Sequence, residues 1–244
     1  MTFVDVDGLR IRYHQAGRGT HVLLLHGWGG CLESMVPISQ ALSSHYRCIS
    51  IDFPGHGESS LPARPWHVSD FLDITLKLMD RLDVAQTHIV AHSFGGRVSI
   101  KMAAAYPQRI HKILFTAGAG VPAPLSLARK LKRTAAHFKF LLPKSAQKRL
   151  LPFLASRDYM HAGDLRPTLR NILAEDLTPY LAKIKHPCLL VWGDRDFETP
   201  LHCGQVMKRL IVNSELIVFR GAGHFPYLDQ PNKFNLLAQR FFRE

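Results

Sequence analysis

Short apolar runs alternate along this chain with longer segments in which apolar residues recur at helical spacing. Runs of the first kind are typical of strands buried on both faces, and segments of the second kind are typical of helices that cover them. The alternation predicts the α/β class, with a mainly parallel central sheet between two layers of helices. The expected strands are 22–26, 47–51, 88–91, 112–116, 188–192 and 216–219, and the expected helices are 33–44, 69–82 with Ser69 as N-cap, 94–106, 201–210 and 231–242.

The N-terminal segment MTFVDVDGLRIRYH has another pattern, because apolar and polar residues alternate on either side of Asp7 and Gly8. This alternation predicts two strands joined by a tight turn. It lacks the basic block and following apolar block that mark a secretory signal. Nothing else in the chain requires a transmembrane span, so we expect the protein to act in the cytoplasm.

The run IVAHSFGG, residues 89–96, puts a serine between an expected strand and an expected helix. Ala91 and Gly95 flank Ser93 at two positions on either side. Small residues suit these positions because a bulky side chain would collide with neighbouring backbone in a sharp turn. The pattern indicates a nucleophile elbow, the strand-to-helix turn that lifts a serine hydroxyl into a pocket.

Two further motifs follow the serine in a fixed order: VWGDRDFETP at 191–200 and RGAGHFP at 220–226. Together with LLLHGWGG at 23–30 and IDFPGHGES at 51–59, this order of serine, acid and histidine resembles the α/β-hydrolase family. The resemblance extends over nearly the whole chain. With 244 residues and 46% hydrophobic content, the chain fits one such catalytic core with an inserted cap. The expected core is 1–118 and 177–244, and the expected cap, mostly helical, is 119–176.

The resemblance implies a catalytic serine and a base. A serine hydroxyl is a poor nucleophile at neutral pH, so Ser93 needs a base within hydrogen-bonding reach and a third group that orients this base. His224 is the expected base, because it lies in a glycine-rich loop after the last strand, where the family has its catalytic histidine.

Three acids in the segment 191–200 are candidates for the orienting group. The family's spacing between the glycine and the proline of this motif selects Asp196. Some relatives carry the acid after the preceding strand, but the segment 116–124 contains no Asp or Glu. We expect Asp194 to hold a turn and Glu198 to be a loop charge that faces solvent.

The resemblance also implies an oxyanion hole formed by the backbone N–H groups of Trp28 and Phe94. Such preorganised donors stabilise the charge that develops on the substrate carbonyl oxygen. The side chains of Trp28 and Phe94 are then free to line the substrate pocket, and we expect Phe138 and Leu142 of the cap to line it as well.

Other polar residues near these motifs are expected to be structural. In the family the histidine at the position of His26 is usually structural. We expect Asp52, His56 and Glu58 to hold their loop, and His92 to point away from the catalytic face.

The same motifs exclude several other chemistries. A serine at position 93 disfavours the dehalogenases and epoxide hydrolases of this fold, which use aspartate, and the dienelactone-hydrolase-like enzymes, which use cysteine. No HExxH or similar ligand spacing predicts a metal, and no glycine-rich phosphate loop predicts a nucleotide. We expect a hydrolase without a metal or other cofactor.

The formal charge of +12 is concentrated in the expected cap, where residues 119–176 contain 11 Lys or Arg and 4 Asp or Glu. An amphipathic helix with a solvated basic face accounts for this charge. The charge also suits an anionic substrate or an acidic carrier protein, and less well a membrane surface. No nucleic-acid-binding motif accompanies it.

We predict a serine carboxylesterase (EC 3.1.1) for esters with small to medium apolar acyl or aromatic groups. One alternative is a hydrolase that cleaves C–C bonds of ring-cleavage products with the same three residues. Another is an esterase for acyl groups on an acidic carrier protein, because the HGW segment and the basic cap resemble such an enzyme. A ligand receptor on a hydrolase scaffold is the alternative without catalysis.

Overall fold

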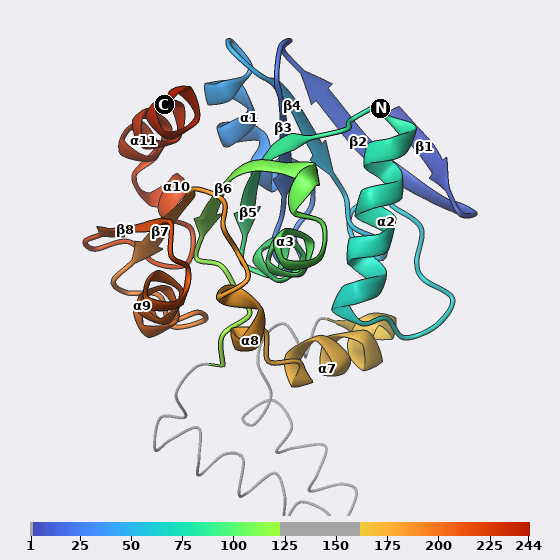
Figure 1. The fold of residues 1–244 in the computed structure, drawn as a ribbon. Helices are drawn as coiled ribbons and strands as arrows, with labels where there is room; N and C mark the ends of the chain where they lie inside the picture. The colour runs from blue at the N-terminus through green and yellow to red at the C-terminus, as the bar shows by residue number, and fades with distance from the viewer. Residues whose placement is uncertain (1, 123–161) are drawn as a thin grey trace, which may run out of the picture.

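The computed structural model describes residues 2–122 and 162–244, whose fold is shown in Figure 1. Its strands are β1 (Thr2–Val6), β2 (Leu9–Ala16), β3 (His21–Leu25), β4 (Arg47–Ile51), β5 (Thr87–His92), β6 (Ile110–Thr116), β7 (Cys188–Gly193) and β8 (Ser214–Phe219). In the described residues they form an eight-stranded sheet in the order β1-β2-β4-β3-β5-β6-β7-β8. β1 and β2 form an antiparallel hairpin that joins β4, and all the other neighbours are parallel. The expected α/β class and the N-terminal hairpin are confirmed.

Helices cover both faces of this sheet. Successive residues of a strand point to opposite faces, so Leu23 and Leu25 belong to one core cluster while Val22 and Leu24 belong to the other. The first cluster packs against α2 (Val68–Arg81), α3 (Phe94–Ala105), α7 (Arg166–Ala174), α8 (Thr178–Leu181) and α9 (Leu201–Leu210). The second packs against η1 (Leu32–Met35), α1 (Val36–Leu42), α10 (Pro226–Asp229) and α11 (Pro231–Arg243). Two further short turns are η2 (Pro107–Arg109) and η4 (Gly163–Leu165).

Two helix starts differ from the sequence prediction. α2 begins at Val68 with His67 as its N-cap, rather than at Ser69, because the Asp70 carboxylate accepts the His67 N–H at 2.7 Å. An acidic side chain at the third helical position satisfies an N–H that the helix itself leaves free. The segment 33–44 is divided into η1 and α1, with Pro37 in the first turn of α1, where its missing N–H costs nothing.

The carboxyl ends of the parallel strands lie along one edge of the sheet, so the loops that follow β3, β5, β7 and β8 come together there. These loops carry Trp28, Ser93, Asp196 and His224. Near this edge the Leu177 N–H donates to the Gly120 carbonyl at 2.9 Å, so the beginning of the expected cap lies beside the first residue of the core that follows it. Most of the cap lies outside the described residues, and its extent remains a prediction.

Among the described residues, no helix combines the length and the apolar character that crossing a membrane would require.

Candidate active site

Ser93 lies at a strained turn between β5 and α3, with φ of 46° and ψ of −108°. Its N–H donates to the Thr116 carbonyl, and its own carbonyl accepts the N–H groups of Gly96 and Ala119. A Cβ atom at Gly95 would lie 2.5 Å from the Leu25 carbonyl oxygen. No larger residue fits there without moving β3 away from α3, and this is the steric limit that the sequence predicts for the elbow.

Asp196 and His224 are in direct contact. The His224 Nδ1 atom lies 2.8 Å from Asp196 Oδ2, and the Asp196 side chain is fully buried. Burial by itself would raise the pKa of Asp196, but hydrogen bonds from His224 and Thr199 outweigh it, and the pKa lies below its usual value. The carboxylate is therefore ionised at neutral pH and can accept a hydrogen bond from the Nδ1–H group of His224. In this tautomer Nε2 carries no proton and can accept one.

Thr199 is a neighbour of this pair that the sequence did not point out. Its N–H donates to Asp196 Oδ1 at 2.9 Å, and its hydroxyl lies 2.8 Å from Asp196 Oδ2 and 3.0 Å from the Ala117 carbonyl. One hydroxyl proton serves one of these two acceptors at a time. The Glu198 N–H is the second backbone donor to Oδ1. These donors fix the orientation of the carboxylate toward His224.

Glu198 lies nearer to His224 than the sequence predicts. Its side chain is 62% exposed, as expected for a loop charge, but its Oε2 atom lies 3.4 Å from His224 Nε2. Among the hydrogen bonds of the described residues, none joins Ser93 Oγ to His224. In structures without a bound substrate such contacts are often long and shorten in the reacting complex. Asp194 accepts the Gly221 N–H at 2.7 Å and holds a turn, as predicted.

His92 does not point away from this site, contrary to the sequence prediction. Its Nε2–H donates to the His224 carbonyl at 3.0 Å, and the centroids of the two rings are 4.8 Å apart. Burial, with a smaller contribution from His224, lowers the pKa of His92 to about 3, so the ring is neutral. His92 follows Ala91 at the end of β5, and strand geometry turns successive side chains to opposite faces. This orientation takes its ring toward the loop after β8.

The backbone N–H groups of Trp28 and Phe94 are available for a ligand. In the described residues neither of them donates a hydrogen bond to the protein. The two side chains touch edge to face, with ring centroids 5.6 Å apart. The loops that carry them are also joined, since the Gly95 N–H donates to the His26 carbonyl at 3.1 Å. The predicted oxyanion residues therefore lie side by side, on loops that are hydrogen-bonded to each other.

His26 holds the first of these loops in place. Its Nδ1–H donates to the Gly27 carbonyl at 2.7 Å, and its Nε2 atom accepts the Phe53 N–H at 3.0 Å. Complete burial is the main cause that lowers the pKa of His26 to about 3. The ring must be neutral for Nε2 to accept a proton, so burial and hydrogen bonding favour the same tautomer. The structural role expected for His26 is confirmed.

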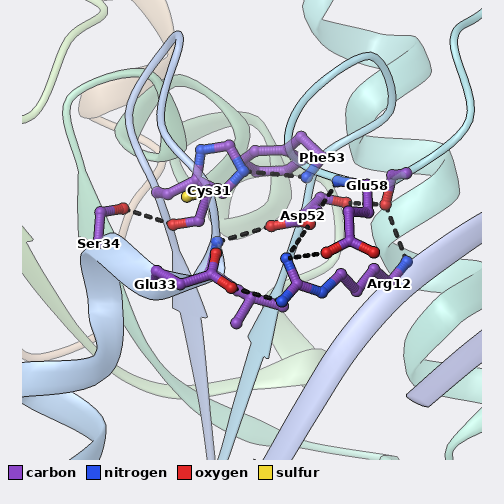
Figure 2. Close-up of polar contacts among 10 residues, drawn as sticks. Arg12, Cys31, Glu33, Ser34, Asp52, Phe53 and Glu58 are labelled. Atoms are coloured by element: carbon purple, nitrogen blue, oxygen red, sulfur yellow. Dashed lines mark hydrogen bonds and ion pairs between the residues drawn. The ribbon is translucent and has the colours of Figure 1, made fainter. Parts of the chain in front are cut away.

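Asp52 connects the same loop to the loop after β4, as Figure 2 shows. This fully buried carboxylate accepts the N–H of Leu32 at 2.6 Å, the N–H of Glu58 at 2.9 Å and a guanidinium N–H of Arg12 at 3.3 Å. Arg12 also pairs with Glu33 and Glu58. The charge of Asp52 is therefore matched by a cation and two amides, and the expected loop-holding role of Asp52 is confirmed.

A cavity of about 430 Å³ opens beside Ser93. Trp28 and Phe94, two of the four residues that we expect in the substrate pocket, line this cavity. The other two, Phe138 and Leu142, lie outside the described residues. Arg97 is a lining residue that the sequence analysis missed, since an arginine in an Ala-rich helix gives no sign of which way it points. Among the described residues, the lining consists of Trp28, Ser93, Phe94, Arg97, Ala119, Gly120, Val121, Pro122, Leu169, Ile172, Leu173, Glu198, Thr199 and Cys203.

Comparisons with known proteins agree with the fold described above. A sequence model described as the alpha/beta hydrolase family matches residues 22–235. The dihydrolipoyllysine-residue acetyltransferase component of the acetoin cleaving system of Pseudomonas putida is 28% identical over 260 residues, which cover 98% of this chain and 68% of that protein. The 2-hydroxy-6-oxononadienedioate/2-hydroxy-6-oxononatrienedioate hydrolase of Escherichia coli K12 is 28% identical over 264 residues, 96% of this chain and 91% of that one. The crystal structure of the enol-lactonase from Burkholderia xenovorans LB400 has a TM-score of 0.78 at 24% identity and covers 100% of both chains.

Proposed function

Because the chain belongs to the alpha/beta hydrolase family, we propose that it is a serine hydrolase with Ser93 as nucleophile, His224 as base and Asp196 as the acid that orients the base. The observation that carries this proposal is the 2.8 Å contact between His224 Nδ1 and Asp196 Oδ2, at the same edge of the sheet as the strained elbow of Ser93. The contact holds the imidazole in the tautomer that can take a proton from a serine hydroxyl.

In the proposed reaction Ser93 Oγ attacks the substrate carbonyl carbon while His224 Nε2 takes the hydroxyl proton. The N–H groups of Trp28 and Phe94 stabilise the oxyanion that forms. His224 then gives its proton to the leaving group, an acyl-enzyme remains, and a water activated by His224 releases the acid. Glu198, 3.4 Å from Nε2, has to move aside when Ser93 and His224 come into hydrogen-bonding contact.

The first candidate for the bond that is cleaved is a carboxylic ester with a small to medium acyl group. The cavity supports this candidate, because Val121, Leu169, Ile172 and Leu173 give it an apolar wall beside the serine. The enol-lactonase with the same fold is named for cleavage of a cyclic ester. If this activity is correct, the protein is a carboxylesterase, and we propose that it acts in the cytoplasm.

The second candidate is cleavage of a C–C bond next to a carbonyl group. It is favoured by the Escherichia coli relative, which is named for hydrolysis of oxo-dienedioates and matches this chain over 96% of its length. The leaving group in such a reaction is a carbon atom that has to be protonated, and the same serine, acid and histidine serve it.

Relative turnover of an ester and of an oxodienoate by the wild type separates these candidates, and Ser93→Ala tests the nucleophile that both require. We expect wild-type protein to hydrolyse 4-nitrophenyl butyrate and to react with a fluorophosphonate probe, and we expect the variant to do neither. If the wild type is labelled by the probe but turns over a 2-hydroxy-6-oxodienoate faster than the ester, C–C cleavage is the activity. Strong thermal stabilisation by ligands without turnover of either substrate would instead favour a receptor.

The third candidate is an esterase for acyl groups on an acidic carrier protein, which the excess of Lys and Arg in residues 119–176 supports. Added salt screens long-range attraction. It should then raise the apparent KM for a carrier-bound ester far more than that for a small neutral ester, and equal effects would exclude this activity.

A further inference from the structure

Arg97 is a buried cation in the wall of the substrate cavity. It lies one helical turn after Ser93 in α3, and only 8% of its surface is exposed. Together with Ser93 and Phe94 it lines the cavity. The reaction proposed above uses no charge at this position.

The guanidinium of Arg97 has few partners in the described residues. Its Nη1 atom donates to the Glu175 backbone carbonyl at 2.8 Å. The Glu175 carboxylate itself pairs with Lys101 at 2.6 Å, and within the described ranges no carboxylate lies at ion-pair distance from Arg97. A guanidinium carries five N–H donors, so most of them have no acceptor in this part of the chain.

Burial of a guanidinium without a counter-charge has an unfavourable desolvation free energy, which a bound anion would offset. Burial is the main cause that lowers the pKa of Arg97, and the negative charges of Glu175 and Asp176 oppose this effect only in part. Arginine nonetheless keeps its proton in proteins, and a buried charge is ordinarily matched by a counter-charge and hydrogen bonds. An acceptor that enters the cavity would satisfy the remaining donors.

We propose that Arg97 binds a carboxylate group of the substrate, so that the preferred substrates carry an anionic end at a distance from the bond that is cleaved. The inference rests on the proposed function, since it assigns the substrate class of the same site. A planar guanidinium can bind a carboxylate through two parallel hydrogen bonds, which fixes the orientation of the substrate as well as its charge.

The position of Arg97 defines the shape of such a substrate. Four residues of α-helix separate the Cα atoms of Ser93 and Arg97 by roughly 6 Å along the axis. The wall shared by these residues includes Phe94, Leu169 and Ile172, so a hydrocarbon spacer suits the space between the two ends. Glu198 lies beside His224, and its negative charge would repel a carboxylate that entered in the reverse orientation.

Pairs of 4-nitrophenyl esters that differ only in the terminal group test the proposal. The anionic members are the half-esters of adipate and pimelate, and the neutral members are the hexanoate and the heptanoate. We expect Arg97→Met to lower kcat/KM for the anionic members by roughly 10- to 100-fold more than for the neutral members, which is the range of a lost charged hydrogen bond. Arg97→Lys should lie between the two, because lysine keeps the charge but not the planar fork.

Arg170→Met is the matched control. Arg170 is an exposed cation of α7, next in sequence to the cavity residue Leu169 but not part of the lining. Its loss should leave the ratio of anionic to neutral turnover unchanged. A parallel loss on both members in Arg97→Met would mean that Arg97 only holds α3 to residue 175, and an unchanged ratio would mean that no carboxylate binds there. Either result overturns the proposal.

Binding without turnover separates this inference from the proposed function. We expect heptanoate to raise the Tm of the wild type more than heptanamide does, and we expect this difference to vanish in Arg97→Met. If no ester is hydrolysed but the difference depends on Arg97, the esterase proposal fails and the carboxylate site stands. If esters are hydrolysed and heptanoate binds no better than the amide, the carboxylate site is wrong.

Discussion

His92 donates a hydrogen bond from Nε2 to the backbone carbonyl of His224, 3.0 Å away. The residue that precedes the proposed nucleophile thus holds the loop that carries the proposed base. Because the bond joins the ends of β5 and β8, it sets the position of the imidazole relative to the elbow.

We expect His92→Phe to lower kcat by roughly 3- to 10-fold with little change in KM, since one neutral hydrogen bond contributes about 1 kcal/mol and His92 is not among the described residues that line the cavity. Steady-state kinetics on 4-nitrophenyl butyrate measure this effect. A larger change in KM than in kcat would show that the variant disturbs the cavity instead of the base.

Asp196→Asn should lower kcat by about 10³- to 10⁴-fold, because an amide in place of the carboxylate favours the wrong tautomer of the His224 imidazole. The same change in chymotrypsin-type enzymes has an effect of about this size. Asp194→Asn is the matched control. Asp194 lies two residues earlier, and among the described residues its carboxylate accepts one hydrogen bond, from the Gly221 N–H at 2.7 Å, so its variant should keep most of the activity. Comparable losses in the two variants would contradict the assignment of Asp196.

The free energy of unfolding should fall as the pH is lowered from about 6.5. The pKa values of His26 and His92 are about 3 in the folded protein, below the usual 6.5, so between these values the unfolded chain binds more protons. Their neutral forms contribute stability that is fully present above pH 6.5 and is lost as the pH falls toward 3, at up to about 1.4 kcal/mol per pH unit for each histidine. Asp196, whose pKa is lowered as well, adds a loss at still lower pH.

Urea unfolding at pH 7 and at pH 4.5 measures this dependence. His92→Phe should have a shallower slope than the wild type, because it removes one of the titrating groups. An unchanged slope in this variant would mean that His92 does not resist protonation in the folded state.

Asp52→Asn should destabilise the protein by about 3 kcal/mol, because it removes one partner from a buried ion pair and weakens the acceptor for two backbone amides. The matched control is Glu33→Gln, at the other end of the same arginine. The Glu33 side chain is 51% exposed, and exposed ion pairs contribute less than about 1 kcal/mol. Chemical denaturation of both variants gives the comparison, and equal effects would show that burial of Asp52 is not what makes the network important.

The local hydrophobic pattern was sufficient to predict most of the strands and helices. The expected strand 47–51 and the expected helix 201–210 have the bounds that the structure gives them, and the other predicted elements differ at their ends. The elbow was predictable as well, because the need for small residues on either side of Ser93 follows from backbone sterics within a few residues. The extent of the cap and the pocket residues Phe138 and Leu142 remain predictions.

Tertiary structure alone decided which polar side chains surround the site. The contacts of His92, Glu198 and Thr199 with His224 join residues that are far apart in the chain, and hydrophobic periodicity carries no information about such pairs. Arg97 is a further example, because α3 is buried on most of its surface and the sequence does not tell which of its side chains line the cavity. The sequence by itself determined the strands, the hairpin and the turn at Ser93, since these depend on the periodicity and steric limits of neighbouring residues. Which way each charged side chain points, and whether it lines the cavity, depend on how distant elements pack, so only the tertiary structure decides them.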